Sequence, residues 1–352
     1  MDTLAIPTGA HELTAEWLTA AMGCDGTVTD VDASPVGTGQ VADSIRLRLT
    51  WDPPDAGPPS VVVKVTSSSE TSRAAALGTR TYEVEVGFYN DLAPSLPVHR
   101  PGCWWAGFDA ATVGYAVVLD DMAPAVAGDQ MRGCTVDEAS AAVEELALLH
   151  GARWGDGSLA DLPWLNRYGP DHAASIGGLV GMMVPGFLER YASSLPDDAV
   201  ALTERYVPLL GAAAADPAPR TVVHQDFRND NLLFGGPGGR VCVVDWQTVS
   251  LGPALSDVAY FLGGSLLPDD RRASEKALVR HYHERLLAAG DVELSWDDCW
   301  TGYRRHAFAG LTMAIVASML VVRTDRGDQM FIAMAERAAR HALDLETEAL
   351  LS

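Results

Sequence analysis

Four polar residues between positions 224 and 245 have the types and spacing that phosphoryl transfer requires. His224, Asp226 and Asn231 form an H-x-D-x-x-x-x-N pattern, and Asp245 follows at the end of the apolar run Val241 to Val244. A carboxylate can orient an acceptor hydroxyl and take its proton, while hard oxygen ligands hold the magnesium ion that neutralises the charge of a triphosphate. We therefore predict that Asp226 is the catalytic base and that Asn231 and Asp245 bind Mg²⁺.

The same residues allow other interpretations. His224, Asp226 and Asp245 could instead bind a transition metal in a hydrolase, because histidine and carboxylates are common metal ligands. For His224 we prefer a structural role, in which the ring hydrogen-bonds and braces the loop. Short motif matches taken singly have a high rate of false positives, so it is the ordered combination that favours phosphoryl transfer.

A lysine upstream supplies a cation for the triphosphate. Lys64 lies in the β-branched run Val61 to Val65, and a helix expected from about residue 73 to 92 carries Glu85. A buried lysine needs a counter-charge, so we predict that Glu85 holds Lys64 against the α- and β-phosphates. Glu83 on the same helix is the rival partner.

Two glycines and a further aspartate flank these residues. Gly37 and Gly39 lie in a turn before Lys64, where the absence of Cβ atoms lets the backbone approach a phosphate, although ordinary turn glycines are the alternative. Asp257 lies at the start of an expected apolar helix. Its carboxylate can accept backbone N–H bonds and brace the catalytic loop, or it can simply cap the helix.

Composition excludes several classes of function. The 352 residues include 47 acidic and 25 basic side chains, a net charge of −22 that opposes binding to nucleic acid or to an anionic membrane. The charge would suit a cationic acceptor, although solubility alone accounts for it. The five cysteines form no C-x-x-C pair, which predicts reduced thiols in a cytoplasm. The N-terminus has no basic n-region, and the apolar run from Ala307 to Val322 is too short to span a bilayer, so a buried helix is expected there.

The order of the expected elements predicts two lobes. The first part of the chain is rich in strands, expected at residues 45–49, 61–65, 104–108 and 115–119. After Pro124 helices dominate, interrupted by two short strands, and they are expected at residues 136–150, 176–214 and from 270 onward. We predict an α+β fold with a β-rich nucleotide-binding lobe at residues 1–119, a linker at 120–124, and a larger, mainly helical catalytic and acceptor-binding lobe at 125–352.

These motifs resemble those of the aminoglycoside phosphotransferase-like superfamily, and more closely its ecdysteroid kinase-like and choline-kinase-like branch. The resemblance covers roughly residues 35 to 263 and is carried by the segments 35–40, 63–64, 85–89, 117–122, 148–154, 224–231, 245–247 and 257–260. It implies a bilobal protein-kinase-like fold that binds ATP between the lobes, with backbone groups of Asp120 and Met122 on the adenine. The sequence departs from the commonest form at Gln225, where many relatives have glycine, and at Trp246 and Gln247.

We therefore expect an ATP- and Mg²⁺-dependent phosphotransferase acting on a hydroxyl of a small molecule, such as an amino sugar, an aminoglycoside, or a choline-like or sterol-like alcohol. The alternative is a catalytically silent nucleotide-binding regulator, but such a relative would have lost at least one of the residues Lys64, Asp226, Asn231 and Asp245. The chain is expected to be a monomer or a homodimer. Gln130 and Arg132, after the linker, either line the acceptor site or lie in a surface loop.

Overall fold

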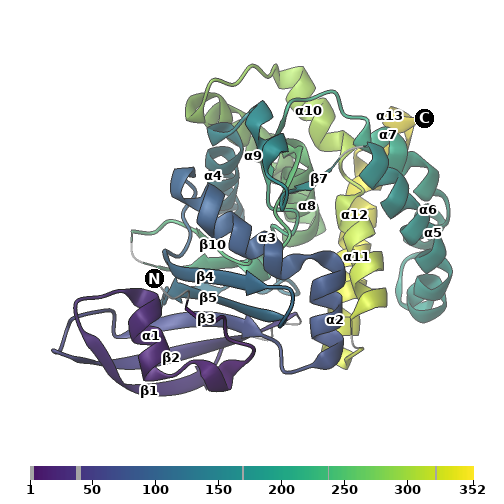
Figure 1. Ribbon diagram of the computed structural model, residues 1–352. Helices are drawn as coiled ribbons and strands as arrows, with labels where there is room; N and C mark the ends of the chain where they lie inside the picture. Colours follow the sequence, from purple (N-terminus) through teal and green to yellow (C-terminus); the bar gives the residue numbers. More distant parts are fainter. Residues whose placement is uncertain (1–3, 37–40, 169, 237, 322) are drawn as a thin grey trace. The chain divides into compact units, whose positions relative to one another are not determined.

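The chain divides into two compact units. The computed structural model describes residues 4–36, 41–168, 170–236, 238–321 and 323–352 (Figure 1). Unit 1 comprises the residues up to Ser95, Arg100–Ala123 and Asp245–Thr248, and unit 2 comprises Leu96–His99, Pro124–Val244 and Val249–Ser352. The short segment Asp245–Thr248 thus groups with the N-terminal unit, whereas the prediction divided the chain into contiguous lobes.

Unit 1 is built on a five-stranded antiparallel sheet with the strand order β1-β2-β3-β5-β4. Its elements are η1 (Ala10–Glu12), α1 (Ala15–Met22), β1 (Thr27–Pro35), β2 (Ala42–Asp52), β3 (Ser60–Thr66), α2 (Glu70–Thr79), α3 (Thr81–Gly87), the π-helical η2 (Phe88–Leu92), η3 (Ala93–Ser95), β4 (Cys103–Asp109) and β5 (Gly114–Asp120). Lys64 on β3 lies opposite Ser44 of β2 and Val117 of β5. The lysine therefore lies in the centre of the sheet.

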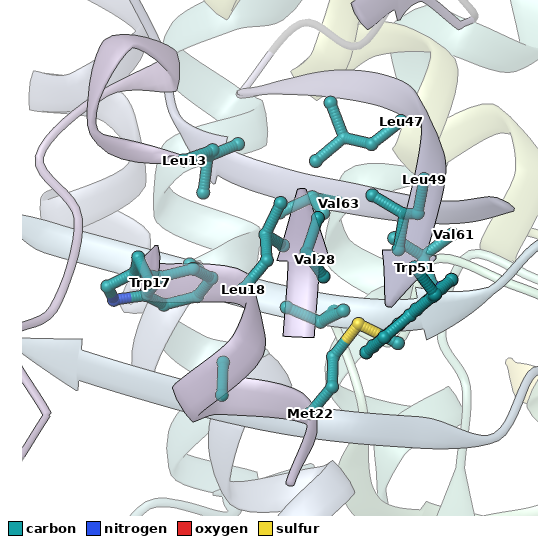
Figure 2. Close-up of a cluster of buried hydrophobic side chains, with 13 residues drawn as sticks. Leu13, Trp17, Leu18, Met22, Val28, Leu47, Leu49, Trp51, Val61 and Val63 are labelled. Carbon is teal, nitrogen blue, oxygen red and sulfur yellow. The ribbon is translucent and has the colours of Figure 1, made fainter. Parts of the chain in front are cut away.

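Helix α1 covers one face of this sheet. Thr14 caps its first turn by accepting a hydrogen bond from the Trp17 N–H, and Gly23 ends it in a left-handed conformation, φ 61°. Figure 2 shows the apolar core that results, which includes Leu18 from the helix and Val63 from β3. Side chains alternate along a strand, so Lys64 points to the opposite face of the sheet from Val63.

Two features of unit 1 differ from the prediction. The single helix expected over residues 73–92 is wrong, because Arg80 adopts a left-handed conformation, φ 59°, that ends α2 and precedes α3. Strand β1 was not predicted at all. Seven of its nine residues are exposed, Val31 is half-buried and only Val28 is buried, so the strand has no clear alternation and its sequence has the character of a loop.

Unit 2 is mainly helical, with two small three-stranded sheets of order β10-β9-β6 and β7-β11-β8. Its strands are β6 (Val126–Ala127), β7 (Asn166–Arg167), β8 (Arg220–Val223), β9 (Leu232–Phe234), β10 (Cys242–Val243) and β11 (Ser250–Pro253). Its longer helices are α4 (Val136–Ala152), α5 (Pro170–Tyr191), α6 (Asp197–Arg205), α8 (Ala254–Ser265), α9 (Pro268–Ala289), α10 (Trp296–Arg305), α11 (Ala309–Leu320) and α12 (Asp325–Asp344). The short helical elements are η4 (Gly157–Asp161), η5 (Ala192–Ser194), η6 (Val207–Leu209), α7 (Leu210–Ala214), η7 (Asn229–Asn231) and α13 (Thr347–Leu351).

Helix α8 forms the centre of unit 2. All of its residues are buried, and it packs against α4, α10, α11 and α12. Strand β8 leads into the loop that carries Asp226, and η7 and β9 follow that loop directly. Helix α8 also packs against β8, so a fully buried helix lies beside the strand that leads to Asp226. No helix among the described ranges is both long and apolar enough to cross a membrane.

Candidate active site

Lys64 forms ion pairs with two carboxylates in unit 1. Its Nζ atom lies 2.7 Å from Glu85 Oε2 and 2.7 Å from Asp245 Oδ1. Glu85 is buried, and the hydroxyl of Tyr115 on β5 donates to it at 2.6 Å. The rival, Glu83, is instead a partly exposed residue paired with Arg80 at 2.8 Å. Of the two candidate acids on α3, Glu85 is therefore the one that holds Lys64.

The surroundings of Lys64 keep it charged. Burial opposes its positive charge, but the carboxylates of Asp245 and Glu85 more than compensate and raise the pKa of Lys64 above its usual value. Burial and the neighbouring Glu85 carboxylate likewise raise the pKa of Tyr115 well above its usual value, so its hydroxyl keeps its proton and remains a donor. The result is a fixed cation at the centre of the sheet.

The segment that carries Asp245 is anchored to unit 1 by an aromatic stack. Trp246 is fully buried, and its ring stacks on that of Phe88 with a centroid distance of 4.0 Å and an interplanar angle of 7°. Asp245 itself adopts a left-handed backbone conformation, φ 68°, which Asp tolerates better than most residues. Trp246 is one of the positions where the sequence departs from the commonest form of the family. The residue therefore has a structural role, because its ring fixes the position of the Asp245 carboxylate.

Asp226 accepts hydrogen bonds from three neighbours in unit 2. Tyr260 on α8 donates its hydroxyl to Oδ1 at 2.8 Å, and the Asn231 amide donates to Oδ2 at 2.9 Å. The Nε atom of Arg228 donates to Oδ2 at 3.3 Å and lies 3.2 Å from Oδ1. A carboxylate has about four acceptor positions, so this arrangement orients Asp226 and leaves one position for the hydroxyl of a substrate.

Arg228 and Tyr260 both keep their protons in this environment. Burial opposes the charge of Arg228, but Asp226 and its other ion-pair partner, Asp230, raise its pKa above the usual value. Burial and the Asp226 carboxylate raise the pKa of Tyr260 well above its usual value. Asp226 is therefore surrounded by donors at any ordinary pH.

Asn231 and Asp245 fit Mg²⁺ by the chemistry of their donor atoms. The amide nitrogen of Asn231 is engaged twice, by the backbone oxygen of Asp226 at 2.8 Å and by its Oδ2. The Asn231 side-chain oxygen is thus the atom of the amide that remains to bind a ligand. Asp245 contributes a carboxylate, and Mg²⁺ prefers carboxylate and amide oxygens.

Asp257 braces the loop before Asp226. Its Oδ2 accepts the backbone N–H of His224 at 2.6 Å, and its Oδ1 accepts that of Gln225 at 2.9 Å. Gln225 adopts φ 69°, a left-handed conformation that costs a non-glycine residue roughly 1–2 kcal/mol. The two hydrogen bonds to Asp257 hold this strained turn, which explains how a glutamine is accommodated where many relatives have glycine.

The ring of His224 is engaged on both sides. Nε2 is 3.0 Å from the backbone oxygen of Val244, and Nδ1 accepts the N–H of Asp226 at 3.3 Å. These bonds favour a bracing role for His224 over metal ligation. Within the described parts of the chain, no three His, Cys, Asp or Glu side chains gather in a way that could hold a metal ion.

Asp120 and Met122, the predicted partners of the adenine, belong to unit 1. The N–H of Asp120 donates to Gly102 O at 2.9 Å, and its carboxylate accepts the N–H of Gly102 and the Trp104 ring N–H. The contact of the Asp120 and Met122 backbones with an adenine stays a prediction. Gly37 and Gly39 lie outside the described residues.

Several residues of the site were missed, some of them because they are distant in sequence from the residues that they contact. Tyr115 and Tyr260 gave no local signal, and Arg228 was not considered. Gln130 is buried: its Oε1 accepts the N–H of Asn229 and its N–H donates to Asp230, both at 3.0 Å. Gln130 therefore supports η7, and the surface-loop interpretation of this residue was wrong.

The catalytic loop and the helices around it match a known family. Residues 124–298 fit the sequence model of the phosphotransferase enzyme family, APH. This part of the chain is therefore similar in sequence to the phosphotransferase enzyme family. The resemblance recognised from the motifs is thereby confirmed.

Solved structures of low sequence identity share the fold of this chain. It is similar to Plasmodium vivax ethanolamine kinase (10% identity, TM-score 0.56, covering 91% of this chain and 83% of that chain). It is also similar to choline kinase from Cryptosporidium parvum (10% identity, TM-score 0.57, 90% and 89%) and to the gentamicin complex of APH(2")-IIa (13% identity, TM-score 0.54, 96% and 99%). The predicted α+β, protein-kinase-like fold is therefore confirmed. No match was found among curated protein sequences.

Proposed function

We propose that the chain is an ATP- and Mg²⁺-dependent phosphotransferase that phosphorylates a hydroxyl of a small molecule. The observation that carries this proposal is the hydrogen-bonded pair of Asp226 and Asn231. Together with the bonds from Tyr260 and Arg228, the bonds between them leave one acceptor position on the Asp226 carboxylate, and they leave the Asn231 amide oxygen available. A proton acceptor beside a magnesium ligand is the combination that phosphoryl transfer needs.

In this proposal each residue has a distinct role. Asp226 receives the hydrogen bond of the acceptor hydroxyl and takes its proton as the oxygen forms a bond to the γ-phosphorus. The bond between the γ-phosphorus and the β–γ bridging oxygen breaks, and ADP leaves. Lys64, kept charged by Glu85, binds the α- and β-phosphates, while Asn231 and Asp245 would hold the Mg²⁺ that would neutralise the triphosphate. The backbones of Asp120 and Met122 bind the adenine.

The names of the structural neighbours support an alcohol as the acceptor. Choline kinase and ethanolamine kinase are named for small amino alcohols, and gentamicin is bound in the third neighbour. A catalytically silent regulator remains the second candidate. The presence of Lys64, Asp226, Asn231 and Asp245, together with the hydrogen bonds that orient Asp226, favours the enzyme.

An acceptor screen tests the proposal. The purified chain is incubated with ATP and Mg²⁺ against neutral, anionic and cationic alcohols, ADP formation is measured, and the phosphate ester is identified by mass spectrometry. We expect magnesium-dependent ADP formation that requires an alcohol and yields one ester per ADP. Tight binding of MgATP without turnover across the whole panel would support the regulator instead.

A further inference from the structure

Unit 2 contains an apolar pocket of about 150 Å³. Side chains from α5, α7, α8, α10 and α11 and from the loop between the last two line it. Its apolar wall consists mainly of Ile176, Leu210, Phe308, Met313 and Val316. An apolar cavity of this size is large enough for a molecule such as benzene. The pocket therefore has room for the body of a small acceptor.

This pocket adjoins the predicted base. Two of its lining residues are Gln225 and Tyr260. Gln225 directly precedes Asp226 in the chain, and Tyr260 donates its hydroxyl to Asp226 Oδ1. A ligand in the pocket thus lies against residues that contact or adjoin the carboxylate that is to receive the hydroxyl proton.

The ionisable groups in the pocket wall do not favour a cation. Both oxygens of Asp257 are engaged by the backbone N–H groups of the catalytic loop. His306 is paired with the buried Asp216 at 2.7 Å. Arg305 donates to the backbone oxygen of Ala212 at 2.8 Å, and among the described residues it has no carboxylate within ion-pair distance. Among the described residues of this wall, Arg305 is therefore the arginine without a carboxylate beside it, while the charge of Asp257 is stabilised by backbone N–H groups and by His150 at 3.3 Å from its Oδ2.

We propose that this pocket binds the acceptor and that the acceptor is a largely apolar alcohol, neutral or anionic, of about the bulk of one ring. This inference rests on the proposed phosphotransferase function. It opposes the expectation from the net charge of −22, because the overall field of the protein concerns its surface, whereas the local wall carries Arg305. A cation about 5–6 Å from an unneutralised guanidinium would bind on the order of 100-fold more weakly than an uncharged molecule of the same shape.

Three alcohols of nearly the same shape test the charge preference. These are 4-methylbenzyl alcohol, 4-(hydroxymethyl)benzoate and 4-(aminomethyl)benzyl alcohol, and calorimetry measures their binding to the unmodified protein. We expect the neutral and anionic compounds to bind at least 10-fold more tightly than the ammonium compound. In Arg305→Met this discrimination should fall to less than threefold, whereas Arg285→Met, at an exposed arginine of α9, should retain it. Tightest binding of the ammonium compound would overturn the inference.

A variant that fills the pocket tests the location. Ala309 lines the pocket at the start of α11, and Ala309→Phe should weaken binding of 4-methylbenzyl alcohol at least 10-fold while leaving MgATP binding unchanged. Unchanged binding of the alcohol in a variant that still binds MgATP would overturn the pocket assignment. If Ala309→Phe fails to fold, the affinities of a homologous series of neutral alcohols for the unmodified protein test whether the alcohol binds in an apolar pocket. Affinity should rise about threefold to fourfold per added methylene until the volume is filled, and an absence of any rise would contradict an apolar pocket.

Turnover separates this inference from the proposed function. Phosphorylation of cationic alcohols alone would support the phosphotransferase proposal. It would overturn the proposal that the acceptor is neutral or anionic. If none of the alcohols is phosphorylated, the phosphotransferase proposal fails, and the pocket is not an acceptor site. Phosphorylation of the neutral or anionic alcohols, lost in Ala309→Phe, would support both.

Discussion

The hydroxyl of Tyr260 donates a hydrogen bond to Oδ1 of Asp226 at 2.8 Å, from a helix whose residues are all buried. Asp226, the predicted base, is therefore oriented by a side chain of α8 as well as by residues of the catalytic loop. Since burial and Asp226 raise the pKa of Tyr260, this donor stays protonated across the pH range of an ordinary assay. We regard Tyr260 as a positioning residue, because it acts through Asp226.

Removal of this hydroxyl should slow turnover without affecting nucleotide binding. A hydrogen bond to a charged group contributes about 1.5–3 kcal/mol, so we expect kcat of Tyr260→Phe to fall roughly 10-fold or more while KM for ATP is unchanged. The control is Tyr303→Phe, which removes a buried hydroxyl that donates to Glu275 at 2.9 Å. An equal loss of kcat in both variants would show that the effect is one of general stability.

The buried pair of Lys64 and Glu85 predicts a specific order of stabilities. Lys64→Met leaves Glu85 buried without its cation, and breaking such a pair costs about 3–5 kcal/mol. In Lys64→Met/Glu85→Gln no charge is stranded at position 85 and the amide oxygen can still accept the hydrogen bond of Tyr115, so we expect the free energy of unfolding, measured with urea, to recover most of the loss. Glu83→Gln, at the exposed pair with Arg80, should change it by less than about 1 kcal/mol. A double variant less stable than Lys64→Met would contradict this account.

Asp257 should matter for both stability and turnover. In Asp257→Asn only one side-chain oxygen remains for the two backbone N–H groups of His224 and Gln225. One buried donor is then unsatisfied, at a cost of about 1–3 kcal/mol, and the loop that carries Asp226 loses its brace. We expect a lower urea midpoint together with a fall in kcat. Asp269→Asn, at a residue whose side chain is 97% exposed, should change neither.

His341 predicts how stability depends on pH. Burial, together with Arg271, lowers the pKa of His341 well below its usual value, so the ring is neutral in the folded protein and becomes charged only on unfolding below about pH 6.5. Its contribution is therefore fully present above pH 6.5 and is lost as the pH falls, by about 1.4 kcal/mol per pH unit.

Urea unfolding at pH 8 and pH 5 measures this dependence. Between these values His341→Gln should lose about 2 kcal/mol less stability than the unmodified protein. His281→Gln, at a partly exposed histidine that contacts Glu144, should behave like the unmodified protein. The same loss in His341→Gln as in the unmodified protein would rule out a neutral buried ring.

Local signals in the sequence predicted part of the fold. The cap at Thr14 and the left-handed Gly23 that bound α1 are signals of this kind, because both act through neighbouring residues. The break at Arg80 was missed, since arginine carries no signal for a left-handed conformation. Strand β1 was missed because hydrogen bonds to β2 hold it rather than a buried apolar face.

The residues of the site also divide into those with a signal in the sequence and those that only tertiary packing brings together. Lys64, Glu85 and Asp245 were recognised from their types and order, and the structure brings these three together in unit 1. Tyr260 and Gln130 could not be recognised, because their contacts to Asp226 and Asn229 join parts of the chain that only tertiary packing brings together. The charge of the pocket wall also could not be predicted from the sequence, because the net charge of the chain does not show which side chains line a cavity.

The most direct test of the account is the rate of phosphoryl transfer in Asp226→Asn. The change keeps the size of the side chain but removes the proton acceptor, and a general base contributes about 10²–10⁴-fold to a rate. With the best acceptor from the screen and saturating MgATP, we predict that kcat falls at least 100-fold while the Kd for MgATP stays within about threefold of the unmodified protein. A kcat within threefold of the unmodified value would contradict the assignment of Asp226 as the base.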